Sequence, residues 1–130
     1  MINPENKASL VYLAVPSRLC KDDPTAMERQ MDLVTKEGKA PLHPFQALPY
    51  NRFEGNEMIG KARTWDFCLR LVEISEEFWL FGVSHGTLNE MEHAIKLGKQ
   101  IRVLLDQWDP DWRLHYADRE PKNKILDEMV

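Results

Sequence analysis

Short apolar runs alternate with amphipathic segments along this chain, and this alternation restricts the fold more than any other feature. SLVYLAVP (9–16), FWLFGV (78–83) and IRVLL (101–105) have the length and the continuous apolar content of strands buried on both faces. A further short strand is expected to end near His43. The order β-α-β-α-β-α-β predicts an α/β fold, a flavodoxin- or Rossmann-like three-layer sandwich with a four- to five-stranded parallel sheet.

Helix signals separate the apolar runs. Asp23, followed by proline, is a natural N-cap, and Gly38 is expected to end the helix that follows. The clearest helix covers about 56–74. Another is expected over about 88–98, where Gly98 ends it. In the 56–74 helix the predicted buried stripe consists of Met58, Ala62, Trp65, Leu69 and Val72.

A length of 130 residues corresponds to one domain over 1–130. Its C-terminal tail, 106–130, is charged and less regular than the rest of the chain. Within this tail RLHYA (113–117) could form a fifth strand, and WDPDW (108–112) could be an edge loop or an oligomer contact.

Composition and charge exclude several classes of protein. A net charge of −4 with well-mixed signs argues against a nucleic-acid partner. No apolar run approaches the roughly 18–20 residues that cross a bilayer, and MINPENKASL does not resemble a signal peptide. The two cysteines lack metal-ligand spacing. We therefore expect a cytoplasmic protein with reduced thiols, no metal, no cofactor and no membrane partner.

Polar residues follow the predicted strands where ligands bind in open parallel sheets, outside the carboxyl ends. The backbone N–H groups of the turn SHGT (84–87) lie at a helix N-terminus, which favours an anion. The crevice predicted from strand ends alone contains Ser17, Arg18, His43, Ser84, Thr87 and Glu90.

Each of these residues also has a structural explanation. TLNE (87–90) fits the S/T-x-x-E capping box, in which Glu90 would bond back to the N–H of Thr87. Arg18 could be a solvated loop charge. The residues that could serve turn geometry alone are His43, Ser84 and Gly86.

Three segments resemble the nucleoside 2-deoxyribosyltransferase-like family. They are YLAVPSR (12–18), SEEFWLFG (75–82) and the pattern S-x-G-x-x-x-E-x-x-x-A-x-x-x-G-K (84–99). That family includes nucleoside deoxyribosyltransferases, nucleoside 5′-monophosphate N-glycosidases and many small uncharacterised proteins. The resemblance covers about 9–105 and implies a flavodoxin-like sheet, a homodimer or larger assembly, and a small-molecule nucleoside or nucleotide as substrate.

The resemblance implies that Glu90 attacks C1′ of a ribosyl or deoxyribosyl group, and that water or a second base then resolves the glycosyl-enzyme. Ser84 stands where the nucleotide hydrolases carry Ser and the transferases carry Asp, which favours a 5′-monophosphate. Arg18 aligns with an Arg that could pair with the phosphate. Glu77, with Glu76 as an equal alternative, corresponds to an Asp that contacts the sugar and assists the leaving base.

The chemistry agrees with these assignments, because a carboxylate in a first helical turn is expected to stay ionised, as a nucleophile must. The predicted catalytic residues are Glu90 and Glu77, and the predicted substrate-binding residues are Tyr12, Ser17, Arg18, His43, Ser84, Gly86 and Thr87.

The leading hypothesis is an N-glycosidase acting on nucleoside 5′-monophosphates, or a base-exchanging transferase. A non-catalytic nucleotide-binding module is an alternative, because Val15 replaces a frequent Gly of the family and Glu77 replaces an Asp. A glycohydrolase of NAD or another nucleotide derivative is a third possibility, since the bond broken is of the same type.

Overall fold

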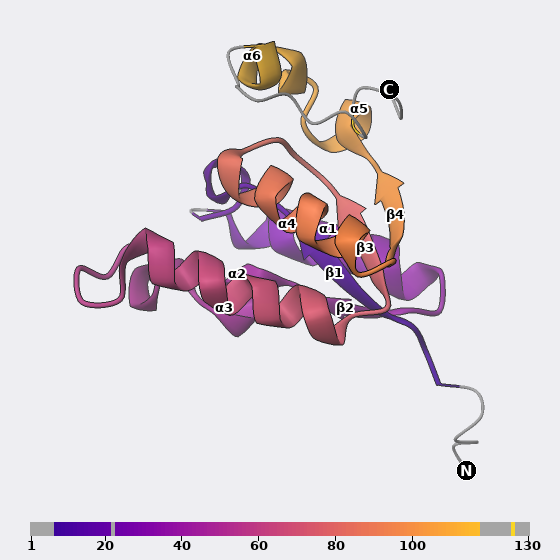
Figure 1. The fold of residues 1–130 in the computed structure, drawn as a ribbon. Helices are drawn as coiled ribbons and strands as arrows, with labels where there is room; N and C mark the ends of the chain where they lie inside the picture. The colour runs from indigo at the N-terminus through magenta and orange to yellow at the C-terminus, as the bar shows by residue number, and fades with distance from the viewer. Residues whose placement is uncertain (1–6, 22, 118–125, 127–130) are drawn as a thin grey trace.

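The structure is a computed structural model that describes residues 7–21, 23–117 and 126. Its described strands form one sheet in the order β2-β1-β3-β4, and all pairings are parallel (Figure 1). The predicted α/β fold with a four-stranded parallel sheet is confirmed. The strands are β1 (Leu10–Ala14), β2 (Ala40–Leu42), β3 (Glu77–Leu80) and β4 (Gln100–Val103).

Helices connect the strands and cover the sheet. The described helices are α1 (Pro24–Lys36), α2 (Pro44–Ala47), α3 (Gly60–Ile74), α4 (His85–Lys96), α5 (Leu105–Trp108) and α6 (Trp112–Ala117), with short 3-10 turns η2 (Ser17–Leu19) and η3 (Tyr50–Arg52).

Alternate residues of the central strand β1 point to opposite faces of the sheet, and both faces are buried. Tyr12 packs in one core cluster with Val72 of α3 and Met91 of α4. Leu13 packs in the other cluster, with Val34 of α1. All five side chains are fully buried. Helices therefore form a layer on each side of the sheet, which explains why the strands read as solid apolar runs.

The helix ends follow the sequence signals. Asp23 caps α1 by accepting hydrogen bonds from the N–H groups of Thr25 and Ala26, at 3.1 and 3.2 Å. Gly38 and Gly98, just past the ends of α1 and α4, have φ values of 75° and 73°. These positive values suit glycine, so both predicted helix ends are confirmed.

Helix α3 is where expected, but it begins later and buries a different face. Gly60 has a φ of 74°, so the helix starts there, and Met58 lies before it, 91% exposed. The buried positions are Thr64, Cys68 and Val72. The predicted stripe holds in part, because Val72 is buried and Trp65 and Leu69 are half-buried, whereas Ala62 is exposed. The polar Thr64 turns inward instead and donates its hydroxyl to the carbonyl of Gly60, at 2.8 Å.

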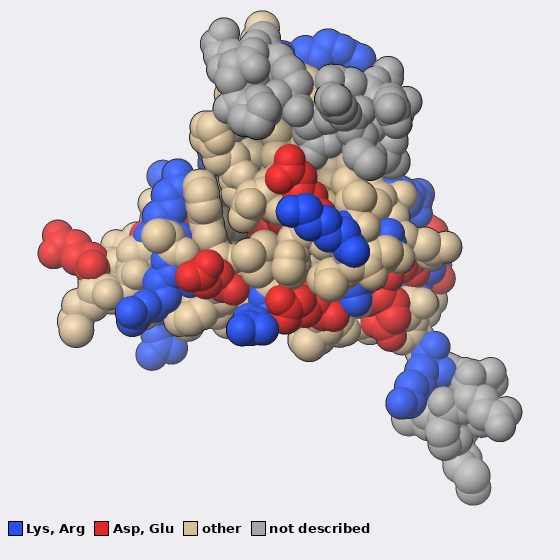
Figure 2. All heavy atoms as spheres, in the orientation of Figure 1, with Lys and Arg blue, Asp and Glu red and all other residues tan. Residues whose placement is uncertain are grey.

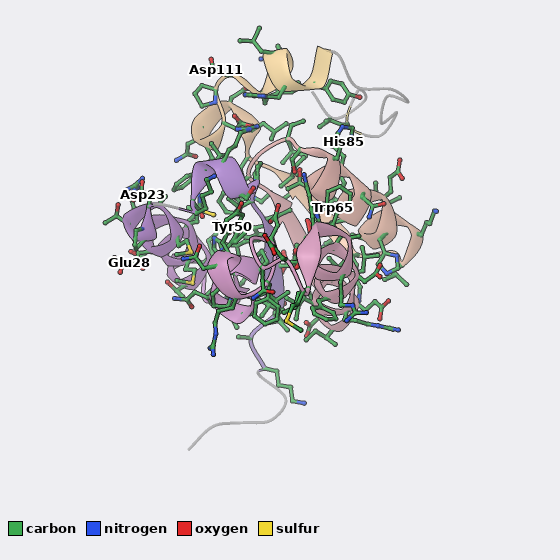
Figure 3. All side chains as sticks on the ribbon, turned by 90° about the vertical axis from the view of Figure 1, so that its left-hand side faces the viewer. Asp23, Glu28, Tyr50, Trp65, His85 and Asp111 are labelled. Carbon is green, nitrogen blue, oxygen red and sulfur yellow. The ribbon has the colours of Figure 1, made fainter. Side chains whose placement is uncertain are left out.

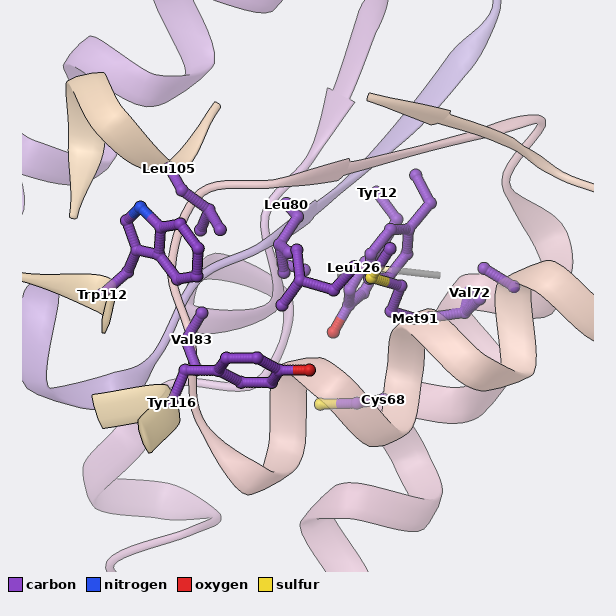
Figure 4. Close-up of a cluster of buried hydrophobic side chains, with 13 residues drawn as sticks. Tyr12, Cys68, Val72, Leu80, Val83, Met91, Leu105, Trp112, Tyr116 and Leu126 are labelled. Carbon is purple, nitrogen blue, oxygen red and sulfur yellow. The ribbon is translucent and has the colours of Figure 1, made fainter. Parts of the chain in front are cut away.

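The predicted fifth strand is wrong, because residues 113–117 belong to α6. Trp112 and Tyr116 lie four residues apart, so a helix places both rings on one face, with centroids 6.0 Å apart. Both rings and Leu126 belong to the core cluster on the α3/α4 side of the sheet (Figure 4). The rest of the predicted oligomer-contact tail, 118–125 and 127–130, lies outside the described residues.

Acidic and basic side chains are interspersed over the face seen in Figure 2, without a broad area of one sign. This agrees with the mixed charge of the sequence. Among the described helices, none combines the length and apolar content needed to span a bilayer.

Candidate functional site

A pocket opens at the carboxyl edge of the sheet, where the chain passes from β1 into η2 and from β3 into α4. Its volume is about 140 Å³, similar to a cavity that holds one benzene-sized ring. Trp65 of α3 and His85 of α4 lie on this side of the molecule (Figure 3). The pocket is lined by Val15, Pro16 and Ser17; by Pro44, Phe45 and Leu48; by Glu54, Lys61, Thr64, Trp65 and Cys68; and by Ser84, His85, Gly86, Thr87 and Glu90.

Helix α4 begins at the pocket with a reciprocal cap. The Ser84 hydroxyl oxygen accepts a hydrogen bond from the N–H of Thr87 at 3.0 Å, and the Thr87 hydroxyl oxygen accepts one from the N–H of Ser84 at 2.8 Å. Thr87 also donates to the carbonyl of Gly82 at 2.8 Å. The predicted capping box of Thr87 with Glu90 is therefore wrong, because the cap lies one turn earlier and leaves Glu90 free of it.

Glu90 lies in the second turn of α4, with only 7% of its surface exposed. Tyr12, fully buried on β1, donates its hydroxyl to Oε2 of Glu90 at 2.5 Å. Burial raises the pKa of Glu90 to about 8; the bond from Tyr12 opposes this rise and the charge of Glu54 adds to it. The expectation that a helix dipole keeps Glu90 ionised is therefore wrong, because burial outweighs a dipole that acts mainly within the first turn.

Two weak acids adjoin Glu90. Burial raises the pKa of the Tyr12 hydroxyl well above its usual range, and the charge of Glu90 adds to this. Burial likewise raises the pKa of the Cys68 thiol to about 12, again with a contribution from Glu90. Both groups therefore keep their protons at neutral pH, and Cys68 is a neutral pocket wall rather than a nucleophile.

Helices α3 and α4 approach each other closely at Gly86. A Cβ atom at this position would lie 3.3 Å from Nε1 of Trp65, tighter than most such contacts. The absence of a side chain therefore lets the indole of Trp65 approach the first turn of α4. Gly86, Ser17, Ser84 and Thr87 all line the pocket, as the sequence predicted.

Arg18 is engaged in a clamp beside the pocket rather than in its lining. Its guanidinium donates to both carboxylate oxygens of Asp109, at 3.2 and 2.8 Å, and to the carbonyl of Val83 at 2.6 Å. Asp109, 2% exposed, also accepts the N–H of Val83 at 3.0 Å. Arg18 and Asp109 thus hold both backbone polar groups of the residue that precedes Ser84.

His43 also lies outside the pocket lining, where it serves the structural role of a turn residue. Its Nδ1 accepts the N–H of Phe45 at 3.2 Å and so caps α2, while Nε2 lies 2.8 Å from Oε1 of Gln30. Since Nδ1 accepts, we place the proton on Nε2, which donates to Gln30. Burial lowers the pKa of His43 to about 4, so the ring is neutral at physiological pH.

Glu77 lies at the opposite edge of the sheet from Glu90. It opens β3, beside Val11 and Gln100, and forms an ion pair with Lys39 at 3.0 Å. Burial would raise the pKa of Glu77, but bonds from Lys39 and Trp79 hold it below its usual value. Glu76 lies at the same edge and accepts the N–H of Leu10. The structure therefore does not bring either carboxylate to the pocket of Glu90.

The pocket residues that the sequence reasoning missed include Glu54, Lys61 and Trp65. None of them follows a strand, so the strand-end rule could not find them. Burial raises the pKa of the half-buried Glu54, although Lys61 and Lys21 partly offset this. The Lys61 ammonium lies 5.2 Å from the centroid of the Trp65 ring.

No family model and no curated protein matches this chain. Among the residues described, no three or more His, Cys, Asp or Glu side chains are grouped as metal ligands would be. The resemblance to the nucleoside 2-deoxyribosyltransferase-like family therefore stays a prediction, and the pocket is the structural feature that bears on function.

Proposed function

We propose that this protein cleaves the N-glycosidic bond of a nucleoside or nucleoside 5′-monophosphate, with Glu90 as the nucleophile. The observation that carries this proposal is the buried carboxyl group of Glu90 in the pocket, bound by the hydroxyl of Tyr12. Tyr12 binds Oε2, and we assign the attack on C1′ to Oε1. A carboxyl group held in one orientation in a mostly dry pocket suits covalent glycosyl transfer.

Glu90 must lose its proton before it can attack. A pKa of about 8 leaves about one-tenth of the molecules ionised at pH 7. The bond from Tyr12 favours that ionised form, because a hydroxyl donates more strongly to a carboxylate than to a carboxylic acid. The attack forms the C1′–O bond as the C1′–N bond breaks, and water then releases the sugar from Glu90.

We assign the ring-sized interior of the pocket to the base and its open mouth to the 5′ end of the sugar. Trp65 and Phe45 offer ring faces for the base. Ser84 and the first turn of α4 offer a hydroxyl and a helix N-terminus for the 5′ end of the sugar. We assign the charge partner of a 5′-phosphate to the pocket residue Lys61, because the guanidinium of Arg18 is already bound to Asp109.

Release of free base, measured by chromatography, tests this proposal. The panel contains ribo- and deoxyribonucleosides with their 5′-monophosphates, each with and without an acceptor base. Wild-type protein should release base and Glu90→Gln should not. Glu92→Gln, the same change at an exposed position of α4, is the matched control and should behave as wild type. Release that persists in Glu90→Gln would contradict the proposal, and release that needs the acceptor would identify a transferase.

A non-catalytic nucleotide-binding module is the second candidate, and the protonation of Glu90 favours it. A neutral carboxyl group at pH 7 can donate a hydrogen bond to a base without attacking the sugar. Calorimetry would then detect nucleotide binding without base release at any pH, including pH 9, where Glu90 is mostly ionised. The homo-oligomer and the cytoplasmic location stay predictions of the sequence.

A further inference from the structure

A second carboxyl group, that of Glu54, lines the same pocket as Glu90. It lies in the segment between η3 and α3, far from any strand end, and it is half-buried. Glu54 and Glu90 are the acidic members of the pocket lining. N-glycosidic cleavage needs two such groups, because the leaving base must gain a proton while C1′ gains a new oxygen.

We propose that Glu54 is the general acid and base of the reaction, protonating the leaving base and then taking a proton from the attacking water. This assignment rests on the proposed N-glycosidase function. It replaces the role that the sequence gave to Glu77, which lies at the amino edge of the sheet in an ion pair with Lys39.

The groups that face Glu54 suit it to exchange a proton. Burial favours its protonated form, and the ammonium groups of Lys61 and Lys21 oppose this. A charge on Glu54 in turn raises the pKa of Glu90. Ionisation of one carboxyl group therefore disfavours ionisation of the other, which suits a site where one is ionised and the other protonated.

Other proton donors of the pocket fit the role less well. The Cys68 thiol, with a pKa of about 12, holds its proton too tightly, as does the Tyr12 hydroxyl bound to Glu90. His85 is exposed at the start of α4. Because it is also a pocket residue, it serves as the rival in the experiment below.

The two steps balance. In the first, ionised Glu90 forms a bond to C1′, the C1′–N bond breaks with its electron pair on nitrogen, and the proton of Glu54 passes to the base. In the second, water forms a bond to C1′ and gives a proton to the Glu54 carboxylate. The bond between C1′ and Glu90 breaks in the same step with its electron pair on the Glu90 oxygen, and both side chains return to their starting states.

A pair of substrates that differ in their leaving groups tests the assignment. One is the purine nucleotide or nucleoside that wild type cleaves best, and the other is 4-nitrophenyl ribofuranoside, whose phenolate leaves without a proton. We expect Glu54→Gln to lower the first-turnover rate on the natural substrate by about 10²- to 10⁴-fold and to leave the first-turnover release of nitrophenol within about tenfold of wild type. Later turnovers should slow on both substrates, because the variant also lacks the base that activates water. Glu90→Gln should lose both activities, and the nearby exposed Glu57→Gln should lose neither.

The pH profile on the natural substrate is the second readout and needs no artificial leaving group. The activity of the wild type should depend on pH in a bell-shaped curve, because one carboxyl group must be ionised and the other protonated. In Glu54→Gln the residual activity should no longer decrease at alkaline pH. It should instead rise with pH and then stay constant.

Each contrary result has a distinct meaning. If wild type cleaves no substrate, the proposed function is wrong and this assignment falls with it. If wild type is active and Glu54→Gln matches it on the natural substrate, only the assignment to Glu54 is wrong. An equal loss of the first-turnover rate on both substrates would make Glu54 a structural residue and overturn the assignment. A selective loss in His85→Gln, with Glu54→Gln unaffected, would give the role to His85.

Discussion

Tyr12 of β1 and Glu90 of α4 are 78 positions apart in the chain, yet their side chains share a hydrogen bond of 2.5 Å in the interior. The bond joins the central strand to the helix that begins at the pocket. It also fixes a carboxyl group that burial would otherwise keep strongly protonated.

Replacing Tyr12 by phenylalanine should move the ionisation of Glu90 to higher pH. The hydroxyl favours the carboxylate, so its loss raises the pKa of Glu90 above about 8. The limb of the kcat/KM profile that reports the ionisation of Glu90 should shift upward by about one pH unit. Tyr50→Phe, at a half-buried tyrosine of η3, is the control and should leave the limb in place. An unshifted limb in Tyr12→Phe would show that the bond does not tune Glu90.

Glu90→Gln should stabilise the protein at neutral and alkaline pH. The pKa of Glu90 is higher when folded, about 8, than the ordinary value of 4.5 that it takes when unfolded. The contribution of Glu90 to stability is therefore most favourable below pH 4.5, declines as pH rises to about 8, and levels off above it. The variant lacks this loss, which is on the order of 3 kcal/mol at pH 7. Urea unfolding of both proteins at pH 4.5, 7 and 9 measures the difference in their free energies of unfolding. A difference that does not grow with pH would contradict the raised pKa of Glu90.

His43 should contribute to unfolding in acid. Its pKa is about 4 when folded and near 6.5 when unfolded, so its contribution to stability is present above pH 6.5 and is lost as pH falls to about 4. In His43→Asn, which keeps a capping side chain before α2, stability should depend less on pH across this window. His115→Asn, at an exposed position of α6, is the control. Equal pH dependence in wild type and His43→Asn would show that His43 is not buried as a neutral ring.

Arg18→Ala should weaken turnover of nucleosides and of their 5′-monophosphates by the same factor. The reason is that Arg18 holds the turn before Ser84 through Asp109 and Val83. The variant should also lose about 2 kcal/mol of stability, because it leaves a buried carboxylate partly unpaired. Steady-state kinetics on both substrate types measures the ratio. A KM that rises for monophosphates alone would restore the phosphate contact that the sequence predicted for Arg18.

Both cysteine thiols should react slowly with a thiol reagent in the folded protein. Burial raises the pKa of Cys20 and of Cys68 to about 12, so thiolate is scarce at pH 8. Absorbance after adding a disulfide reagent should rise slowly in buffer and rapidly in denaturant. A rapid reaction of one thiol in the native protein would contradict its burial.

The sequence predicted the sheet and part of the site because both depend on local patterns. Solid apolar runs located the strands, and the strand ends located Ser84 and Glu90. Glu77 was misplaced because it is the first residue of β3, and the start of a parallel strand lies at the opposite edge of the sheet from the pocket. Glu54 and Trp65 escaped notice because only tertiary packing brings their segments to α4.

Two overlapping patterns explain the remaining errors. The segments SHGT (84–87) and TLNE (87–90) both fit the start of a helix. Since β3 ends at Leu80, the helix begins at the first of them, with Ser84 as its N-cap. RLHYA reads as a short strand, but the spacing of Trp112 and Tyr116 gives a helix one apolar face to pack on the core. Local propensity could not decide either case, because long-range burial did.

The clamp between Arg18 and Asp109 also provides an optical probe of the pocket. Asp109 lies between Trp108, whose ring packs edge-on against Phe81 at 5.4 Å, and the buried Trp112. Since Asp109 holds the N–H of Val83, a shift of the turn before α4 would be felt at two indole rings. We therefore expect ligand entry to change the intrinsic fluorescence of the unlabelled protein.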